Sequence, residues 1–280
     1  MLEQKTNLLI HKLGLNNDIE FNQKLNVILE DIKSKYRGLL PDIEYLREEF
    51  FELHGQIPSS SVLKYVLPVE REKRRIKHSY FENRKFQNVE SYAFNEEGRK
   101  EALHIAKQYE EYLVSHIEDA KYTFVSGGVK APDRIQKRIY EMEEAGTAWI
   151  HPTILQVRDI VRGKILGDTL KDNERVMDSL LVNHGNIVST FNAYYNLYYD
   201  WRNPHKPYPK PYVASNITLG FDKNLPYEVQ LKTKRADVLD IMTHKVTVAQ
   251  EIALPPELSD HMESLCYASH ILDYQEYFKE

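Results

Sequence analysis

The sequence predicts an α+β fold: a mixed β-sheet flanked by helices, with a helical extension at the amino terminus. Leucine and isoleucine recur at spacings of three and four over residues 1–54, which gives a helix one apolar face. Beyond residue 120, short runs of alternating apolar and polar residues are separated by turns and helices, as in a sheet. We therefore expect an N-terminal helical extension over residues 1–95 and a sheet-containing domain over residues 96–280.

Composition excludes several classes of protein. The chain has 280 residues, 42% apolar and 28% charged, so it can bury a core and is neither disordered nor fibrous. Its net charge of -5 offers no overall field for a polyanion, so any contact with nucleic acid must be local. Cys266 is the single cysteine, which excludes an intrachain disulfide, and no apolar run approaches the roughly 18 residues of a membrane span. We expect a cytoplasmic protein without membrane contact.

The amino-terminal part predicts helical hairpins over residues 1–54 and a long helix over 96–119, joined through a connector at 79–95 that lacks periodicity. A break at residues 54–58 followed by three serines also fits a helix-turn-helix over 36–67, although two packed helices use the same residues. Five cations within residues 71–77 are either a solvated helix face or a local phosphate contact.

Four strands are predicted over residues 122–130, 159–166, 212–219 and 227–233. Alternation in the last strand places Glu228, Gln230 and Lys232 on one face, opposite Val229 and Leu231. Such a polar row lines either a charged cleft or the solvent-exposed face of an antiparallel sheet. The alternation pattern alone is compatible with both interpretations.

The remaining strands add acidic, basic and aromatic residues. Tyr212 and Asn216 share one face of the third strand, and the proline-rich connector 197–211 before it is long enough to border a site. Asp159 opens the second strand, and two carboxylates from different strands can chelate Mg²⁺. The turn 126–130 offers backbone amides and Lys130 to anionic oxygens. These groups together suit phosphate transfer.

Four segments follow one another in a fixed order: GGVKAPDRI (127–135), DIVRGK (159–164), PYVASN (211–216) and EVQLKT (228–233). In this order they resemble the motifs of the RelA/SpoT-type synthetase domain, and of the small alarmone synthetases in particular, including toxic or divergent members. The family motifs read approximately G-R-V-K-S-x-x-S-I, D-x-x-G-x-R, G-Y-x-x-x-H and E-x-Q-x-R-T. The resemblance continues through DVLDIMTHK (237–245) into the closing helices at 254–278, and so covers about residues 100–278. It implies a nucleotidyltransferase-like mixed sheet.

The resemblance implies a pyrophosphokinase that moves the β,γ-diphosphate of ATP to the 3′-hydroxyl of GDP or GTP, or of the 3′ end of tRNA. Asp159 and Glu228 match the Mg²⁺ ligands, and Glu228 also helps to activate the acceptor hydroxyl. Tyr212 matches the tyrosine that stacks on the acceptor base, and Lys130 faces the ATP phosphates. The other expected nucleotide-binding residues are Arg134, Lys137, Arg138, Arg162, Lys164, Asn216, Gln230 and Lys232.

The chain departs from the family pattern inside the expected site. Gly128 and Lys164 stand where the family clamps the donor adenine between two arginines, and neither offers a planar cation. Arg162 replaces a glycine, Asn216 a histidine and Lys232 an arginine. These departures allow an altered substrate, weak activity or none.

Three interpretations therefore stay open at the level of sequence. The first is the pyrophosphokinase, with local basic residues available to hold tRNA. The second is a catalytically silent relative that senses a nucleotide or a protein partner through the retained cleft and the amino-terminal helices. The oligomeric state is left open in both, and a homo-oligomer is one alternative. The third is an unrelated α+β interaction protein.

Overall fold

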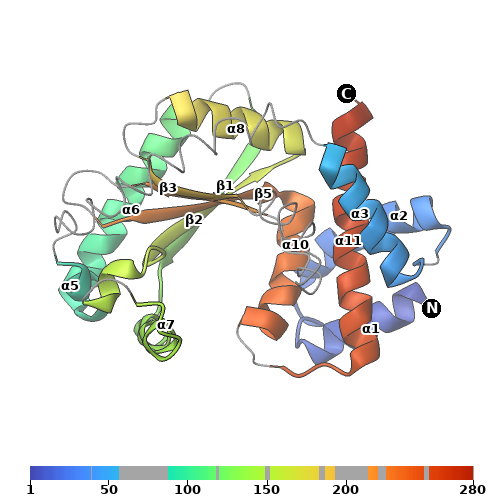
Figure 1. Cartoon of the computed structure of the whole chain (residues 1–280), viewed down its shortest axis with the longest axis horizontal. Helices are drawn as coiled ribbons and strands as arrows, with labels where there is room; N and C mark the ends of the chain where they lie inside the picture. Colours follow the sequence, from blue (N-terminus) through green and yellow to red (C-terminus); the bar gives the residue numbers. More distant parts are fainter. Residues whose placement is uncertain are drawn as a thin grey trace.

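The computed structural model describes residues 1–38, 40–56, 88–117, 120–148, 152–182, 187–192, 214–219, 225–248 and 252–279. Figure 1 shows a central sheet with helices on both sides and a helical layer that joins the two ends of the chain. The predicted α+β fold, with a mixed sheet and amino-terminal helices, is confirmed. Within the described residues, no helix is both long and apolar enough to cross a membrane.

The sheet has five strands in the order β1-β2-β5-β4-β3. They are β1 (Tyr122–Val129), β2 (Val161–Gly167), β3 (Ile187–Asn192), β4 (Ser215–Leu219) and β5 (Tyr227–Thr233). The β2–β5 pair is parallel, and the other three pairs are antiparallel. The strand β3 was not predicted, although its valine, isoleucine, threonine and phenylalanine favour a strand. The prediction that Asp159 opens a strand is wrong, because β2 begins at Val161.

One face of the sheet is apolar and lies under α6 (Glu96–His116) and α8 (Leu170–Val182). Its buried side chains from the strands and the two helices include Ala106, Tyr109, Val161, Ile165, Val176, Met177, Ile217, Val229 and Leu231. Gly163 leaves room for a close neighbour here, because a Cβ at this position would lie 2.2 Å from the Tyr227 hydroxyl. The other face of the sheet carries polar residues of β2, β4 and β5 together with the buried Leu166.

A second core joins the two ends of the chain. The helices α1 (Leu2–Lys12), α2 (Ile19–Tyr36) and α3 (Ile43–Gln56) pack with α10 (Lys234–Thr243) and α11 (Pro256–Lys279). The predicted helical hairpins are therefore present, and the long predicted helix is α6, which ends three residues early. The closing segment predicted as helices is the single helix α11, and a π-helical turn (His244–Val248) follows α10.

The connector prediction for residues 79–95 is wrong in part, because α5 (Val89–Phe94) lies within it. Asn95 ends this short helix and caps α6, since its side chain accepts hydrogen bonds from the amides of Glu97 and Gly98. Other predictions fall outside the described residues: the second half of the helix-turn-helix, the basic residues 71–77 and the connector 197–211. The domain boundary near residue 95 remains a prediction.

His261 of α11 packs against α1 and makes the stability of the protein depend on pH. Its Nε2 lies 2.9 Å from Thr6 Oγ1, whose hydroxyl donates to the Leu2 carbonyl, so the neutral imidazole donates from Nε2. Burial lowers the pKa of His261 to about 4, and the nearby Lys5 charge adds to this effect. The folded protein therefore binds this proton less readily than the unfolded chain, and stability is lost as pH falls from the ordinary histidine pKa toward 4.

We expect wild-type protein to lose roughly 2 to 3 kcal/mol more unfolding free energy than His261→Gln between about pH 7 and pH 4.5, because glutamine does not titrate. Urea denaturation of both proteins at the two pH values measures the difference. Parallel losses in the two proteins would contradict it.

Candidate functional site

A row of polar side chains crosses the face of the sheet opposite α6 and α8. Arg162 of β2 is in register with Glu228 of β5, and Lys164 is in register with Gln230. Asn216 of β4 also pairs with Gln230, which continues the row onto a third strand. Residues paired across neighbouring strands point to the same side, so the predicted division into a polar and an apolar face is confirmed.

Asp159 and Glu228 lie together at one end of this row. Asp159 Oδ2 accepts a hydrogen bond of 2.6 Å from Lys130 Nζ and lies 3.9 Å from Arg162 Nη1. Burial raises the pKa of Glu228, and the charge of Asp159 raises it further. A hydrogen bond from Gln230 and the charges of Lys130 and Arg162 oppose this rise. The two carboxylates and two cations therefore form one electrostatic cluster, which we call the carboxylate cluster.

Arg158 adds a third cation to the carboxylate cluster. Burial lowers the pKa of this guanidinium, and the negative charge of Glu228 opposes the shift. Sequence reasoning missed Arg158, although its place directly before Asp159 was a usable signal.

A β-bulge fixes the position of Lys130. The register of β1 against β2 shifts between Ser126 and Val129, and Gly128 in this bulge has φ +61°. A Cβ on Gly127 would lie 2.7 Å from the Arg162 carbonyl oxygen, so close approach requires glycine.

Hydrogen bonds then hold the backbone of Lys130 on both sides. Its amide donates to the Ile160 carbonyl at 2.7 Å, and its carbonyl accepts from Arg99 Nη1 at 2.9 Å. The prediction that the amides of this turn are free is thus wrong for Lys130. Its side chain remains directed at Asp159.

Lys164 and Lys232 are bound by carboxylates of α10. Lys164 Nζ donates to Asp237 Oδ1 at 2.7 Å. Lys232 is 0% exposed, and its Nζ donates to Asp240 Oδ2 at 2.6 Å and lies 3.4 Å from Asp237 Oδ1. These two lysines join the sheet to α10, with their charge largely neutralised.

The other expected site residues lie in different surroundings. Arg134, Lys137 and Arg138 are exposed on α7 (Pro132–Glu144), where Arg138 pairs with Glu141 at 3.3 Å. Asn216 Oδ1 is buried without a hydrogen-bond partner in the described part of the chain. Tyr212, and with it the predicted stacking platform beside Glu228 and Lys130, lies outside the described residues.

The donor set of the carboxylate cluster fits Mg²⁺ held jointly with a phosphate ligand. Asp159 and Glu228 supply carboxylate oxygens, the atoms that Mg²⁺ prefers, and Mg²⁺ commonly takes only one or two carboxylates beside substrate phosphates. Across the described ranges, no group of three or more histidine, cysteine, aspartate or glutamate residues can hold a metal by itself. The cluster therefore suits a metal that arrives with phosphate oxygens.

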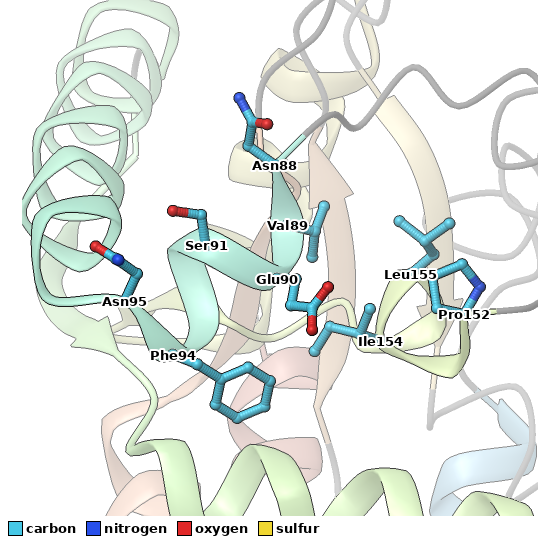
Figure 2. Close-up of a pocket in the computed structure, with 9 residues that line it drawn as sticks. All are labelled: Asn88, Val89, Glu90, Ser91, Phe94, Asn95, Pro152, Ile154 and Leu155. Carbon is cyan, nitrogen blue, oxygen red and sulfur yellow. The ribbon is translucent and has the colours of Figure 1, made fainter.

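A hollow of about 690 Å³ lies elsewhere, between α5 and the short 3₁₀ helix Thr153–Gln156. Figure 2 shows its lining, in which the Glu90 carboxylate lies beside Ile154 and the Phe94 ring. The described lining residues include no lysine or arginine, so this hollow offers a nucleotide phosphate no cation.

The fold is similar to that of small alarmone synthetases at low sequence identity. Small alarmone synthetase 1 from Bacillus subtilis gives a TM-score of 0.48 and 14% identity over 65% of this chain and 91% of that chain. Small alarmone synthetase 2 from the same organism gives a TM-score of 0.41 and 19% identity, over 64% of this chain and 96% of that chain. A chain in the complex between the type VI effector Tas1 and its immunity protein gives a TM-score of 0.37 and 15% identity, over 67% of this chain and 96% of that chain.

Synthetase 1 has also been solved bound to its product pppGpp and bound to AMPCPP. Comparison of the sequence with protein-family models and with curated proteins gives no match. The similarity concerns the fold, and the case for a function rests on the geometry of the site.

The buried lysine gives a prediction about stability. Asp240→Ala removes the closer partner of the fully buried Lys232 and should cost about 3 kcal/mol of unfolding free energy, as for a broken buried ion pair. Lys232→Met removes the buried charge itself and should cost less, about 1 kcal/mol, because the Asp237 and Asp240 carboxylates left behind are 15% and 19% exposed and can be hydrated. Chemical denaturation of the two variants and the wild type measures both values. Equal losses would show that the ammonium of Lys232 does not depend on Asp240.

Proposed function

We propose that this protein is a pyrophosphokinase that transfers the β,γ-diphosphate of ATP to the 3′-hydroxyl of a guanine nucleotide or of tRNA. The observation that carries the proposal is the carboxylate cluster, in which Asp159 and Glu228 lie among Lys130, Arg158 and Arg162. Two carboxylates suited to Mg²⁺, surrounded by cations suited to phosphate oxygens, are what diphosphate transfer requires.

The reaction exchanges one bond to phosphorus for another. The acceptor 3′ oxygen attacks the β-phosphorus of ATP, the bond from that phosphorus to the oxygen bridging to the α-phosphate breaks, and AMP leaves with that oxygen. The hydroxyl proton passes to the carboxylate of Glu228, which lies beside Asp159 on the polar face of the sheet. Lys130 and Arg162 face the phosphates and offset the charge that develops on their oxygens.

Asp159 and Glu228 would hold Mg²⁺ against the phosphates. When bound, this ion supplies charge neutralisation at the transferring group. The orientation of the two carboxylates comes from the chain itself, since Lys130 binds Asp159 and Gln230 donates to Glu228.

The chain recognises its substrates differently from the pattern it resembles. Lys164 and Lys232 are bound to Asp237 and Asp240, so we assign them to the support of α10 rather than to direct nucleotide contact. We assign Arg162, beside Asp159, and Arg158, near Glu228, to the donor nucleotide. Asn216, whose buried Oδ1 has no hydrogen-bond partner among the described residues, is the polar group that we assign to the acceptor side.

A second candidate function is a nucleotide sensor without turnover. The observation that favours it is the neutralisation of Lys164 and Lys232, which leaves fewer cations to stabilise a transferring diphosphate. The sensor would bind ATP or a guanine nucleotide at the carboxylate cluster and release it unchanged.

Transfer assays distinguish the two functions. We expect ATP labelled in the γ-phosphate to pass its label to GDP, GTP or total tRNA, each offered separately with Mg²⁺. Asp159→Asn and Glu228→Gln should each reduce this transfer about 100-fold or more, because each removes a charge that the transition state uses.

Asp168→Asn is the matched control, because this exposed aspartate follows the other end of β2 and pairs with Lys234. It should transfer at the wild-type rate. Label on none of the acceptors would overturn the pyrophosphokinase proposal, and nucleotide binding by calorimetry would then support the sensor.

A further inference from the structure

The ion pair between Lys130 and Asp159 is built into the fold rather than formed by two mobile surface chains. The side chains are 13% and 24% exposed, and the Nζ to Oδ2 distance is 2.6 Å. The backbone of Lys130 is fixed by its hydrogen bonds to Ile160 and Arg99, so its ammonium lies against the Asp159 carboxylate. A charge-assisted hydrogen bond of this kind is stronger than one between neutral groups.

Cations around this pair already compensate its carboxylates. Lys130 and Arg162 match the negative charges of Asp159 and Glu228, and Arg158 lies near Glu228. The neighbouring lysines on the same face do not alter this balance, because they are matched by the two aspartates of α10. A divalent ion that approaches Asp159 therefore meets carboxylates whose charge is already compensated, and an ammonium already bound to the carboxylate oxygen it needs.

A polyphosphate changes both conditions at once. Its negative charges attract the metal ion and offer the Lys130 ammonium new oxygen acceptors. Once Lys130 turns to the phosphates, Asp159 Oδ2 becomes available to a metal that the same phosphates already hold.

We propose that Lys130 competes with the metal for Asp159, so that a divalent cation enters this site together with a polyphosphate and not before it. The proposal rests on the proposed function for the identity of the ligands. It assigns Lys130 a second role, that of a tethered cation which holds the Asp159 carboxylate until the nucleotide arrives.

Metal binding without nucleotide tests the proposal directly. We would titrate the full-length protein with Mn²⁺ alone and follow free Mn²⁺ by electron paramagnetic resonance. Lys130→Met should bind Mn²⁺ about tenfold more tightly than the wild type, because it removes a competing charge-assisted hydrogen bond. The same variant should bind metal-free α,β-methylene ATP about tenfold more weakly in calorimetry, because it loses a phosphate contact.

Opposite changes in the two affinities are the signature of competition, since damage to the structure would weaken both. Lys130→Arg keeps the charge and should retain the weak Mn²⁺ binding of the wild type. Lys107 is an exposed lysine on α6, on the opposite side of the sheet. Lys107→Met therefore removes the same charge away from the site and should change neither affinity. Asp159→Asn combined with Lys130→Met should abolish the gain in Mn²⁺ affinity.

An unchanged or weaker Mn²⁺ affinity in Lys130→Met would overturn the proposal. If circular dichroism shows that Lys130→Met does not fold, Lys130→Gln carries the test with the same expected gain, because its amide removes the charge and keeps a donor. The Mn²⁺ titration needs no turnover. A gain in affinity without any diphosphate transfer would refute the pyrophosphokinase and support the competition, whereas transfer without a gain would refute the competition alone.

Discussion

The parallel pairing of β2 with β5 is the constraint on which the site depends. It places Arg162 beside Glu228 and Lys164 beside Gln230, while Asp159 enters from the segment just before β2. A shift of one residue in the pairing of these strands would turn the polar side chains into the core beneath α6 and α8. It would also move the apolar side chains of the same strands to the opposite face. The apolar face thus fixes the register, and the register brings the carboxylate of one strand to the cations of the next.

Electrostatic compensation then decides which polar groups are available for chemistry. On the side of α10, each lysine of the row has an aspartate partner, and Lys232 is wholly buried with Asp240. At the other end of the row, three cations surround two carboxylates, and the pKa of Glu228 stays raised by burial and by Asp159. The first region holds a helix on the sheet, and the second gathers cations and carboxylates where a ligand can contact both. Arg235 extends the support outward, since it links α10 to Asp31 of α2 and to Glu276 of α11.

Local patterns predicted much of this arrangement. Alternation sorted the residues of β5 into two faces, and the order of four short motifs grouped Lys130, Asp159 and Glu228. The partners of Lys164 and Lys232 could not be predicted, because they depend on how α10 docks on the sheet and not on any spacing along a strand. The strand β3 and the role of Arg158 were missed although signals for both were present. A strand of β-branched residues needs a neighbour to pair with, and the neighbour of β3 comes more than twenty residues later in the chain.

We expect a divalent metal and the phosphates of a nucleotide to meet at Asp159 and Glu228. Crystals grown with Mn²⁺ and α,β-methylene ATP would show whether they do, because anomalous scattering identifies the position of Mn²⁺. The expected result is one anomalous peak bound by both carboxylates and by phosphate oxygens, with Lys130 turned from Asp159 toward the phosphates. A nucleotide seated away from the polar face, or Mn²⁺ bound to neither carboxylate, would contradict it.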